Sequence, residues 1–242
     1  MSSFAINPNA STTRIDIEVG RYFCVVVDDF LVDPAGVIDY AKEHAGKFKL
    51  QERGYPGVQM IPEESKLRDI QRFVRNKLSQ EMNFCRTDIK MVAVFAMITL
   101  PPEDLNWAQR MCHTDPNMRA GYIDVAGLVY LFKDPQLGGT GFYRFRNPQM
   151  FNHAIEIAQT DMAGALAYLK EHLPMYREPS RYLTDSCEAA ELIVTVPPRF
   201  NRAIFYGGGR PHNAIIGMPQ LMVNDVNRGR LTLNFYASAV PK

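Results

Sequence analysis

The last quarter of the chain is the part that most restricts its fold. It consists of short apolar segments, each bounded by proline, glycine or polar residues. They are separated by Pro197-Pro198, by Gly207-Gly208-Gly209 and by the polar stretch 224–229. Short runs rich in β-branched and aromatic residues predict strands, and several such strands in succession indicate a sandwich or a barrel. The predicted strands of this region are 191–196, 202–206, 212–216 and 230–236.

The first part of the chain adds helices to this strand-rich pattern. Asp33 followed by Pro34 predicts a helix start, because an aspartate caps the free N–H groups and a proline lacks one. Apolar residues at helical spacing predict a second helix over about 64–82, and a third helical region follows Asn147 to about 173, broken near 160–164. Further strands are predicted at 22–27, 90–100, 122–132 and 141–145. We expect a single domain over 1–242, mainly β with α, with a strand core of about 88–238 and N-terminal helical support of about 20–87.

Composition excludes several classes of protein. The 27 lysines and arginines nearly balance 26 acidic residues, so the chain lacks the basic excess of a nucleic-acid-binding protein. The longest apolar run, 91–100, is too short to cross a bilayer, and the first 20 residues lack the apolar core of a signal peptide. The 4 cysteines are widely spaced, as is typical of reduced thiols. We expect a cytoplasmic protein that binds a small molecule, and a homodimer is possible.

One histidine stands two residues before an aspartate, in His113-Thr114-Asp115. Alternate residues of an extended segment point to the same side, so an imidazole nitrogen and a carboxylate oxygen converge. His212 opens an apolar strand after the glycine-rich turn and provides a third candidate ligand. Two histidines and one carboxylate suit iron(II) with open coordination positions, whereas a closed structural site needs four protein ligands.

The last predicted strand begins with Arg230-Leu231-Thr232. Arg230 and Thr232 point the same way, and a guanidinium fork beside a hydroxyl is a good receptor for a carboxylate. An arginine that pairs with a surface acid is the alternative for this position. Arg228, in the preceding loop, is the second candidate for the same role.

In this order, His-x-Asp, a later strand-borne histidine and Arg-x-Thr resemble the motifs of the iron(II)- and 2-oxoglutarate-dependent oxygenases, in their prolyl-hydroxylase-like branch. The resemblance extends over about 25–237. It includes 27–31 before the first helix, 129–131 after the His-x-Asp, Gly138-Gly139-Thr140 with Phe142, and 201–205 before the second histidine. The chain departs from the family pattern in a long gap between His212 and Arg230 and in Thr140, where an acidic residue is usual.

The resemblance implies a fold, a cofactor and a reaction. The fold is a double-stranded β-helix, a jelly-roll or cupin-like core, flanked by N-terminal helices and a helical insert. The ligands of iron(II) would be His113, Asp115 and His212. The co-substrate 2-oxoglutarate would be bound by Arg230, Thr232 and Tyr130, and O2 would be the oxidant. The implied activity is hydroxylation of an unactivated C–H bond, with release of succinate and CO2.

The sequence restricts the identity of the substrate less closely than it restricts the fold and the cofactor. An amino acid, a peptide or a natural-product intermediate fits the resemblance, and several arginines near the site would favour a small acid. Desaturation or cyclisation by the same kind of enzyme, and a non-catalytic jelly-roll binding module, remain alternatives. The loop 55–59 is a candidate lid. The candidate substrate-binding residues are Gln109, Arg144, Arg210 and Trp107, with Arg146 as a further candidate.

Overall fold

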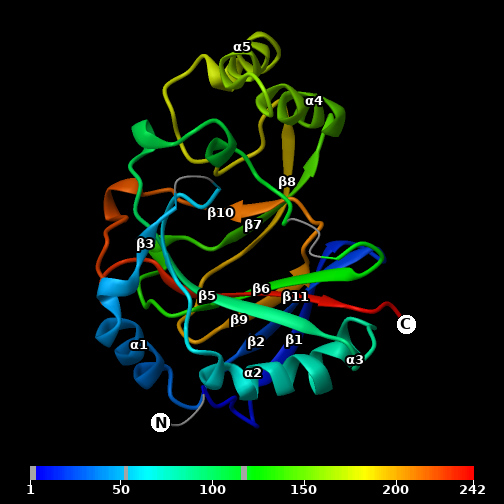
Figure 1. Cartoon of the computed structure of the whole chain (residues 1–242), viewed down its shortest axis with the longest axis vertical. Coiled ribbons are helices and arrows are strands. Elements are labelled where there is room, and N and C mark those ends of the chain that lie inside the picture. Colours follow the sequence, from blue (N-terminus) through cyan, green and yellow to red (C-terminus); the bar gives the residue numbers. More distant parts are fainter. Residues whose placement is uncertain (1–3, 52–53, 116–118) are drawn as a thin grey trace.

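Two antiparallel sheets form the centre of the molecule in the computed structural model, which describes residues 4–51, 54–115 and 119–242 (Figure 1). The larger sheet has the strand order β1-β2-β9-β6-β11-β5-β4-β3, and the smaller has the order β10-β7-β8. The strands are β1 (Ser11–Glu18), β2 (Tyr22–Asp28), β3 (Lys49–Leu50), β4 (Gly57–Met60), β5 (Lys90–Ile98), β6 (Ile123–Tyr130), β7 (Thr140–Phe145), β8 (Ala190–Val196), β9 (Ala203–Gly207), β10 (His212–Ala214) and β11 (Leu231–Ala239).

Helices cover the outer faces of both sheets (Figure 1). The α-helices are α1 (Pro34–Glu43), α2 (Arg68–Phe73), α3 (Ser79–Glu81), α4 (Pro148–Ala158) and α5 (Met162–His172), and a π-helical turn, Val74–Leu78, joins α2 to α3. Short 3-10 turns lie at Ala45–Lys47, Glu64–Leu67, Pro102–Asp104, Ala108–Arg110, Pro135–Leu137, Pro174–Tyr176 and Pro219–Leu221. Within the described ranges, no helix has both the length and the apolar character of a membrane span.

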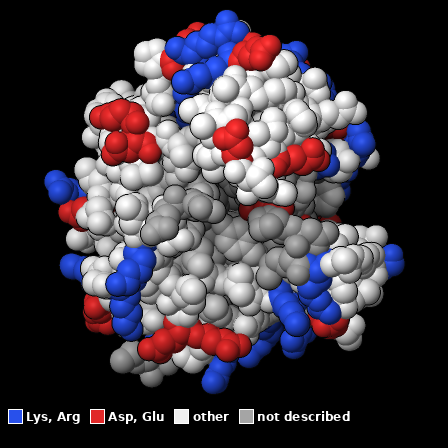
Figure 2. Space-filling model, turned by 45° about the horizontal axis from the view of Figure 1, so that its top comes forward, with Lys and Arg blue, Asp and Glu red and all other residues white. Residues whose placement is uncertain are grey.

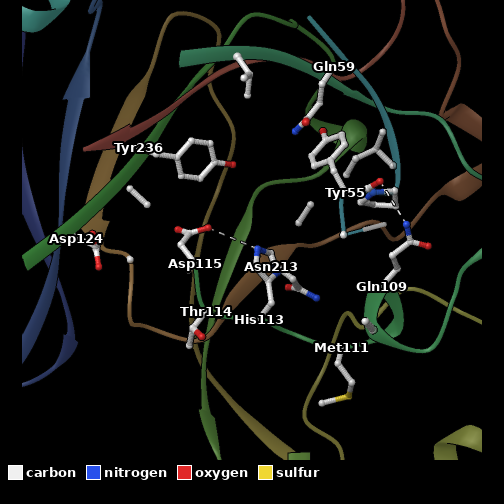
Figure 3. A pocket seen from close by; sticks show the side chains of 18 of the residues that line it. Tyr55, Gln59, Gln109, Met111, His113, Thr114, Asp115, Asp124, Asn213 and Tyr236 are labelled. Atoms are coloured by element: carbon white, nitrogen blue, oxygen red, sulfur yellow. Dashed lines mark hydrogen bonds and ion pairs between the residues drawn. The ribbon is translucent and has the colours of Figure 1, made fainter. Parts of the chain in front are cut away.

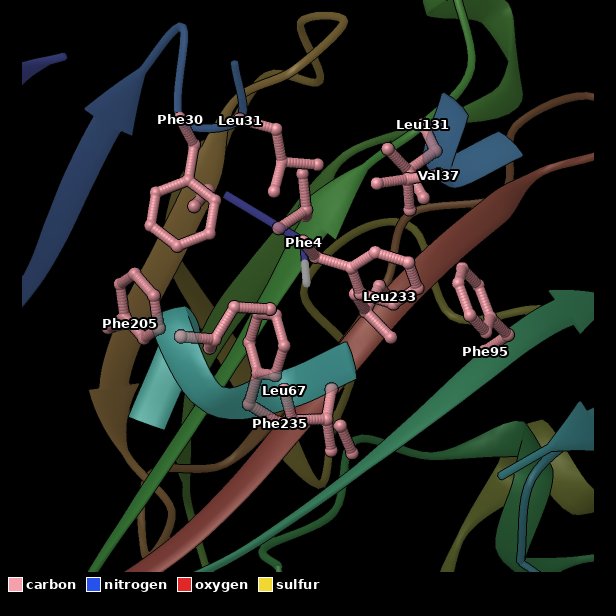
Figure 4. Close-up of a cluster of buried hydrophobic side chains, with 14 of the residues drawn as sticks. Phe4, Phe30, Leu31, Val37, Leu67, Phe95, Leu131, Phe205, Leu233 and Phe235 are labelled. Carbon is pink, nitrogen blue, oxygen red and sulfur yellow. The ribbon is translucent and has the colours of Figure 1, made fainter. Parts of the chain in front are cut away.

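Alternation along the central strands divides the core into two layers. On β11, Leu233 and Phe235 pack with Phe95 and Phe205 in the cluster beneath the N-terminal helices (Figure 4). The intervening positions of the strand point to the opposite face, toward the smaller sheet. There a second cluster includes Leu128 of β6 and other apolar residues from both sheets. The inner layer therefore lies between the two sheets, where a barrel-like fold can hold a site.

The helical insert builds a third cluster on the other side of the smaller sheet. Phe151 of α4 and Leu169 of α5 pack with Tyr143 of β7 and Ala190 of β8. The cluster also contains Met111 and Cys112, which directly precede His113. The insert therefore supports the segment that carries the first histidine of the motif.

Side chains cap the starts of α1 and α5, and the start of α1 is the one that the sequence predicted. Asp33 accepts a hydrogen bond from the backbone N–H of Gly36 at 2.9 Å, and Asp161 caps Gly164 in the same way at 2.9 Å. The break predicted near 160–164 therefore separates α4 from α5. β1, which pairs with β2 at the edge of the larger sheet, was not predicted, because its side chains are mostly polar and exposed.

Candidate metal centre

The two histidines of the motif meet through an isolated antiparallel bridge. The backbone N–H of His113 donates to the carbonyl of His212 at 3.0 Å, and the reverse bond measures 2.9 Å. This pairing extends the smaller sheet beyond β10 and brings the two imidazole rings to 4.5 Å between centroids. Residues that lie far apart in the sequence are thereby fixed side by side.

Asp115 completes the group at the end of the same segment. Its N–H donates to the carbonyl of Gly208 at 2.9 Å, which holds the segment against the turn after β9. Its carboxylate oxygens lie 3.9 Å from Nε2 of His113 and 3.7 Å from Nε2 of His212. One ligand atom from each of the three residues lies within 4.8 Å of the others. The predicted triad is thus brought together.

The electrostatics of the triad fit a cation. The Asp115 side chain is 8% exposed, and its Oδ2 is buried with no hydrogen-bond partner. Burial raises the pKa of Asp115 to about 6 and lowers that of His212 to about 4. A buried carboxylate oxygen without a partner is costly, and a bound cation removes that cost.

The orientation of the His212 ring also favours metal binding. Its Nδ1 lies 2.7 Å from the carbonyl oxygen of Arg210, and a carbonyl only accepts, so Nδ1 carries the proton. The lone pair is then on Nε2, the atom that faces Asp115. The His113 side chain is 58% exposed at the cavity, and the surrounding protein and His212 lower its pKa to about 4. Both imidazoles are therefore neutral at pH 7, the form in which histidine binds metals. The donor set fits iron(II) with open positions for further ligands.

A buried arginine lies at the start of β11. Arg230 is 2% exposed and donates from Nε to the carbonyl of Gly138 at 3.1 Å and from Nη2 to that of Gly139 at 3.2 Å. Arg228, in contrast, is exposed and pairs with Asp225 at 2.9 Å. Arg230 is therefore the buried arginine expected for the carboxylate site. Arg228 forms the kind of surface ion pair that was the alternative for Arg230.

Polar atoms continue along the inner layer beside Arg230. Thr232 and Asn234 occupy successive inward positions of β11, and Tyr130 on the neighbouring β6 bonds to Thr140 at 2.7 Å. Asn234 Oδ1 and the hydroxyl of Tyr55 are buried without a hydrogen-bond partner. Burial raises the pKa of Tyr55 to about 12, while the nearby charge of Arg230 acts to lower it. The polar side chains of this buried layer therefore fit a polar ligand.

The sequence did not single out Asn234 or Tyr236 as site residues, and it included Tyr55 only as part of the candidate lid 55–59. The sequence did carry a signal for Asn234 and Tyr236. With Thr232, they alternate with apolar residues along a central strand. Such a strand, buried on both faces, is otherwise expected to be apolar throughout. No local pattern marks Tyr55, which reaches the inner layer from the loop before β4.

A cavity of about 670 Å³ opens beside the triad (Figure 3). Gln109, a predicted substrate residue, lines it, as do Tyr55 and Gln59 from the predicted lid. The hydroxyl of Tyr236 points into it from β11, next to Asp115 (Figure 3). The volume lies in the usual range for small-molecule pockets.

Other candidate substrate residues are not part of the cavity wall. Arg144 pairs with Glu18 at 3.1 Å and Glu191 at 3.2 Å on the outer surface. Arg210 lies over the ring of Tyr22, 3.3 Å from its centroid. Trp107 donates to the sulfur of Met162 and lines a different hollow. These three side chains do not line the cavity beside the triad, and their contact with a substrate stays a prediction.

Arg146 also bonds elsewhere, from Nε to the carbonyl of Cys187 at 3.2 Å. Sequence order alone placed these side chains near the motif. On a strand, however, the neighbour of an inward residue points outward.

Comparisons with known proteins give one family and several remote structures. No curated protein matches the chain. HygX from Streptomyces hygroscopicus, solved with nickel, 2-oxoglutarate and hygromycin B, is 12% identical, with a TM-score of 0.43 over 90% of this chain and 82% of HygX. EvdO2 from Micromonospora carbonacea var. aurantiaca is 9% identical, with a TM-score of 0.48 over 90% and 87%.

A prolyl-4-hydroxylase from Pseudomonas putida is 11% identical, with a TM-score of 0.40 over 97% of this chain and 99% of that one. Independently of this match, the three residues of the His-x-Asp…His pattern lie together in the structure. The model of a family of unknown function, DUF6445, matches residues 8–237. The chain belongs to this family.

Proposed function

We propose that this protein is an iron(II)- and 2-oxoglutarate-dependent dioxygenase that hydroxylates a C–H bond of a small organic molecule and releases succinate and CO2. One observation carries the proposal: His113, Asp115 and His212 converge within 4.8 Å around a buried carboxylate oxygen that has no hydrogen-bond partner. The buried Arg230 lies in the same inner layer and provides a cationic partner for a dicarboxylate.

We further propose that the two sheets form one domain with a double-stranded β-helix at its centre. The path of the chain supports this fold. From β5 onward the chain alternates between the sheets: β5 and β6 lie in the larger sheet, with the His113 bridge to the smaller sheet between them. β7 and β8 then belong to the smaller sheet, β9 to the larger, β10 to the smaller and β11 to the larger.

In this proposal each part of the site has a defined task. His113, Asp115 and His212 hold the iron, and Arg230, Thr232 and Tyr130 orient the distal carboxylate of 2-oxoglutarate. The bound metal and co-substrate supply the oxidising chemistry when O2 enters. The carboxylate of Asp115 reduces the charge of the centre by one and leaves positions open. The apolar walls of the cavity keep water from the reacting C–H bond.

Anaerobic absorption spectroscopy tests the metal site. Iron(II) with 2-oxoglutarate should give a weak visible charge-transfer band with the wild-type protein. His113→Ala should lose the band, because a ligand of the metal is removed. His153→Ala, a change at an exposed histidine of α4, should keep it. A band that survives in His113→Ala, or its absence in the wild type, would contradict the proposal.

Arg230 and Arg228 form a matched pair for testing the co-substrate site. Arg230→Ala should weaken 2-oxoglutarate binding about tenfold to hundredfold, the effect of losing hydrogen bonds to a charged group. Arg228→Ala should leave it unchanged, because Arg228 pairs with Asp225 at the surface. Titration of the visible band measures both, and thermal unfolding checks that each variant is folded. The reverse order of the two effects would move the role to Arg228.

A further inference from the structure

The wall of the cavity beside the triad is largely apolar. β5 contributes Val92, Val94 and Ile98, β6 contributes Ala126, and the segment before His113 contributes Met111. These positions follow from strand alternation, because alternate residues of β5 and β6 face the space between the sheets. A surface of this kind favours an apolar ligand through the hydrophobic effect.

No lysine or arginine occurs among the described residues that line the cavity. Its acidic side chains are Asp115 and Asp124, and its histidine is His113. Lys and Arg side chains lie mainly around the rim of the face shown in Figure 2. An anionic substrate would lose its hydration in the cavity and find no lysine or arginine among the described lining residues to pair with, which is costly. Arg230 does not line the cavity and is the residue proposed for 2-oxoglutarate.

Two glutamines supply neutral polar groups at this wall. The amide of Gln109 is already used: its Oε1 accepts from the N–H of Asn106 at 2.9 Å, and its Nε2 donates to the carbonyl of Tyr55 at 3.3 Å. The side-chain amide of Gln59, on β4, makes no hydrogen bond to the described residues and points toward the cavity (Figure 3). An amide offers both a donor and an acceptor without charge. Gln59 is therefore a neutral polar anchor at the cavity wall whose side chain is not used by the described residues.

We propose that the substrate is an uncharged, largely apolar molecule whose one neutral polar group hydrogen-bonds to Gln59. That this ligand is a substrate rests on the proposed function. Its chemical class, however, follows from the residues of the cavity wall. It replaces the expectation of a free amino acid or a small acid, which depended on arginines that the structure places outside the cavity.

Matched pairs of compounds test this class directly. We would measure thermal unfolding of the protein with manganese(II) and 2-oxoglutarate, a mixture that binds without turnover. The pairs are 4-phenylbutanamide with 4-phenylbutanoic acid and decanamide with decanoic acid. A ligand that binds the folded state raises Tm. Each amide should bind about tenfold or more tightly than its acid, because the acid must bury a charge without a partner.

A charge introduced at Gln59 should reverse the preference. Gln59→Arg places a cation at the cavity wall and should improve binding of the acids about tenfold. Gln159→Arg, which adds the same charge at the exposed end of α4, should change neither member of a pair. The Tm of each variant without ligand shows whether it is folded. If Gln59→Arg is folded and the acids gain nothing, the role of Gln59 is overturned.

The outcomes separate this inference from the proposed function. If the acids bind as well as the amides, or if no amide raises Tm, the inference fails while iron and 2-oxoglutarate binding still stand. If manganese(II) and 2-oxoglutarate fail to bind, the proposed function fails. The amide-over-acid preference is then measured on the metal-free protein. On the iron-loaded protein, succinate release should rise with the amides and stay at its basal rate with the acids.

Discussion

At the residue scale, Asp28 joins the end of β2 to the turn before β9. Its carboxylate accepts from Nε of Arg202 at 2.7 Å and Nη2 at 3.0 Å, and from Nη1 of Arg199 at 3.1 Å. These hydrogen bonds, above all that with Arg202, lower the pKa of Asp28 below its usual 3.8. A carboxyl with a lowered folded-state pKa stabilises the protein above pH 4, and the effect is lost as the pH falls through the folded-state value.

We therefore expect Asp28→Asn to lower the free energy of unfolding at pH 7 by about 1.5–3 kcal/mol, the range for hydrogen bonds to charged groups. Urea unfolding measures it, and the difference from the wild type should shrink as the pH falls below 4. Asp29→Asn is the control, since Asp29 is 63% exposed and lies 3.8 Å from Arg199. Equal effects of the two changes, or a difference independent of pH, would refute this account of Asp28.

The three candidate metal ligands were predictable from single residues, whereas most residues that line the cavity were not. His113 and Asp115 are two positions apart, so the extended backbone alone brings them to one side. His212 was predictable because a polar residue opens an apolar strand. Trp107 comes shortly before the His-x-Asp motif and Arg144 follows the Gly-Gly turn, but neither lines the cavity. Which face a residue occupies depends on pairing between distant strands.

At the scale of elements, the turn before β7 fixes Arg230. Gly138 has φ +85°, and a Cβ at this position would lie 1.9 Å from the carbonyl oxygen of Ile215. Its own carbonyl accepts from Nε of Arg230. Gly138→Ala should cost at least about 1–3 kcal/mol through backbone strain, with the steric clash in addition.

Gly217→Ala is the matched control, because a Cβ there meets no atom within 4 Å. Its free energy of unfolding should stay within about 0.5 kcal/mol of the wild type. Urea unfolding compares the two variants. A Gly138→Ala protein as stable as Gly217→Ala would show that the turn tolerates a side chain and does not constrain Arg230.

Most elements were predictable because their patterns are local. The strands β5 and β6 and the helix α1 fall within the predicted ranges, since apolar runs and capping residues mark them. β1 was not predicted because it lies at a sheet edge and exposes polar side chains. The helix predicted over 64–82 is present but includes 3-10 and π turns, which hydrophobic spacing does not distinguish.

At the scale of the whole molecule, a metal bound at the triad should stabilise the fold. It would bind only when His113, Asp115 and His212 are together, so it would favour the folded state by mass action. Manganese(II) at a hundredfold excess over its Kd should raise Tm by about 5 °C or more. His212→Ala should abolish the rise, and His153→Ala should retain it. A rise that persists in His212→Ala would place the metal elsewhere.

The bridge between His113 and His212 has a consequence for the order of events during synthesis. These two ligands are about a hundred positions apart, and such distant contacts form late because the intervening chain must first be ordered. A nascent chain that still lacks His212 holds only two of the three ligands. A metal that needs all three ligands would therefore bind only after the segment with His212 has joined the fold, and its binding would report that this late contact has formed.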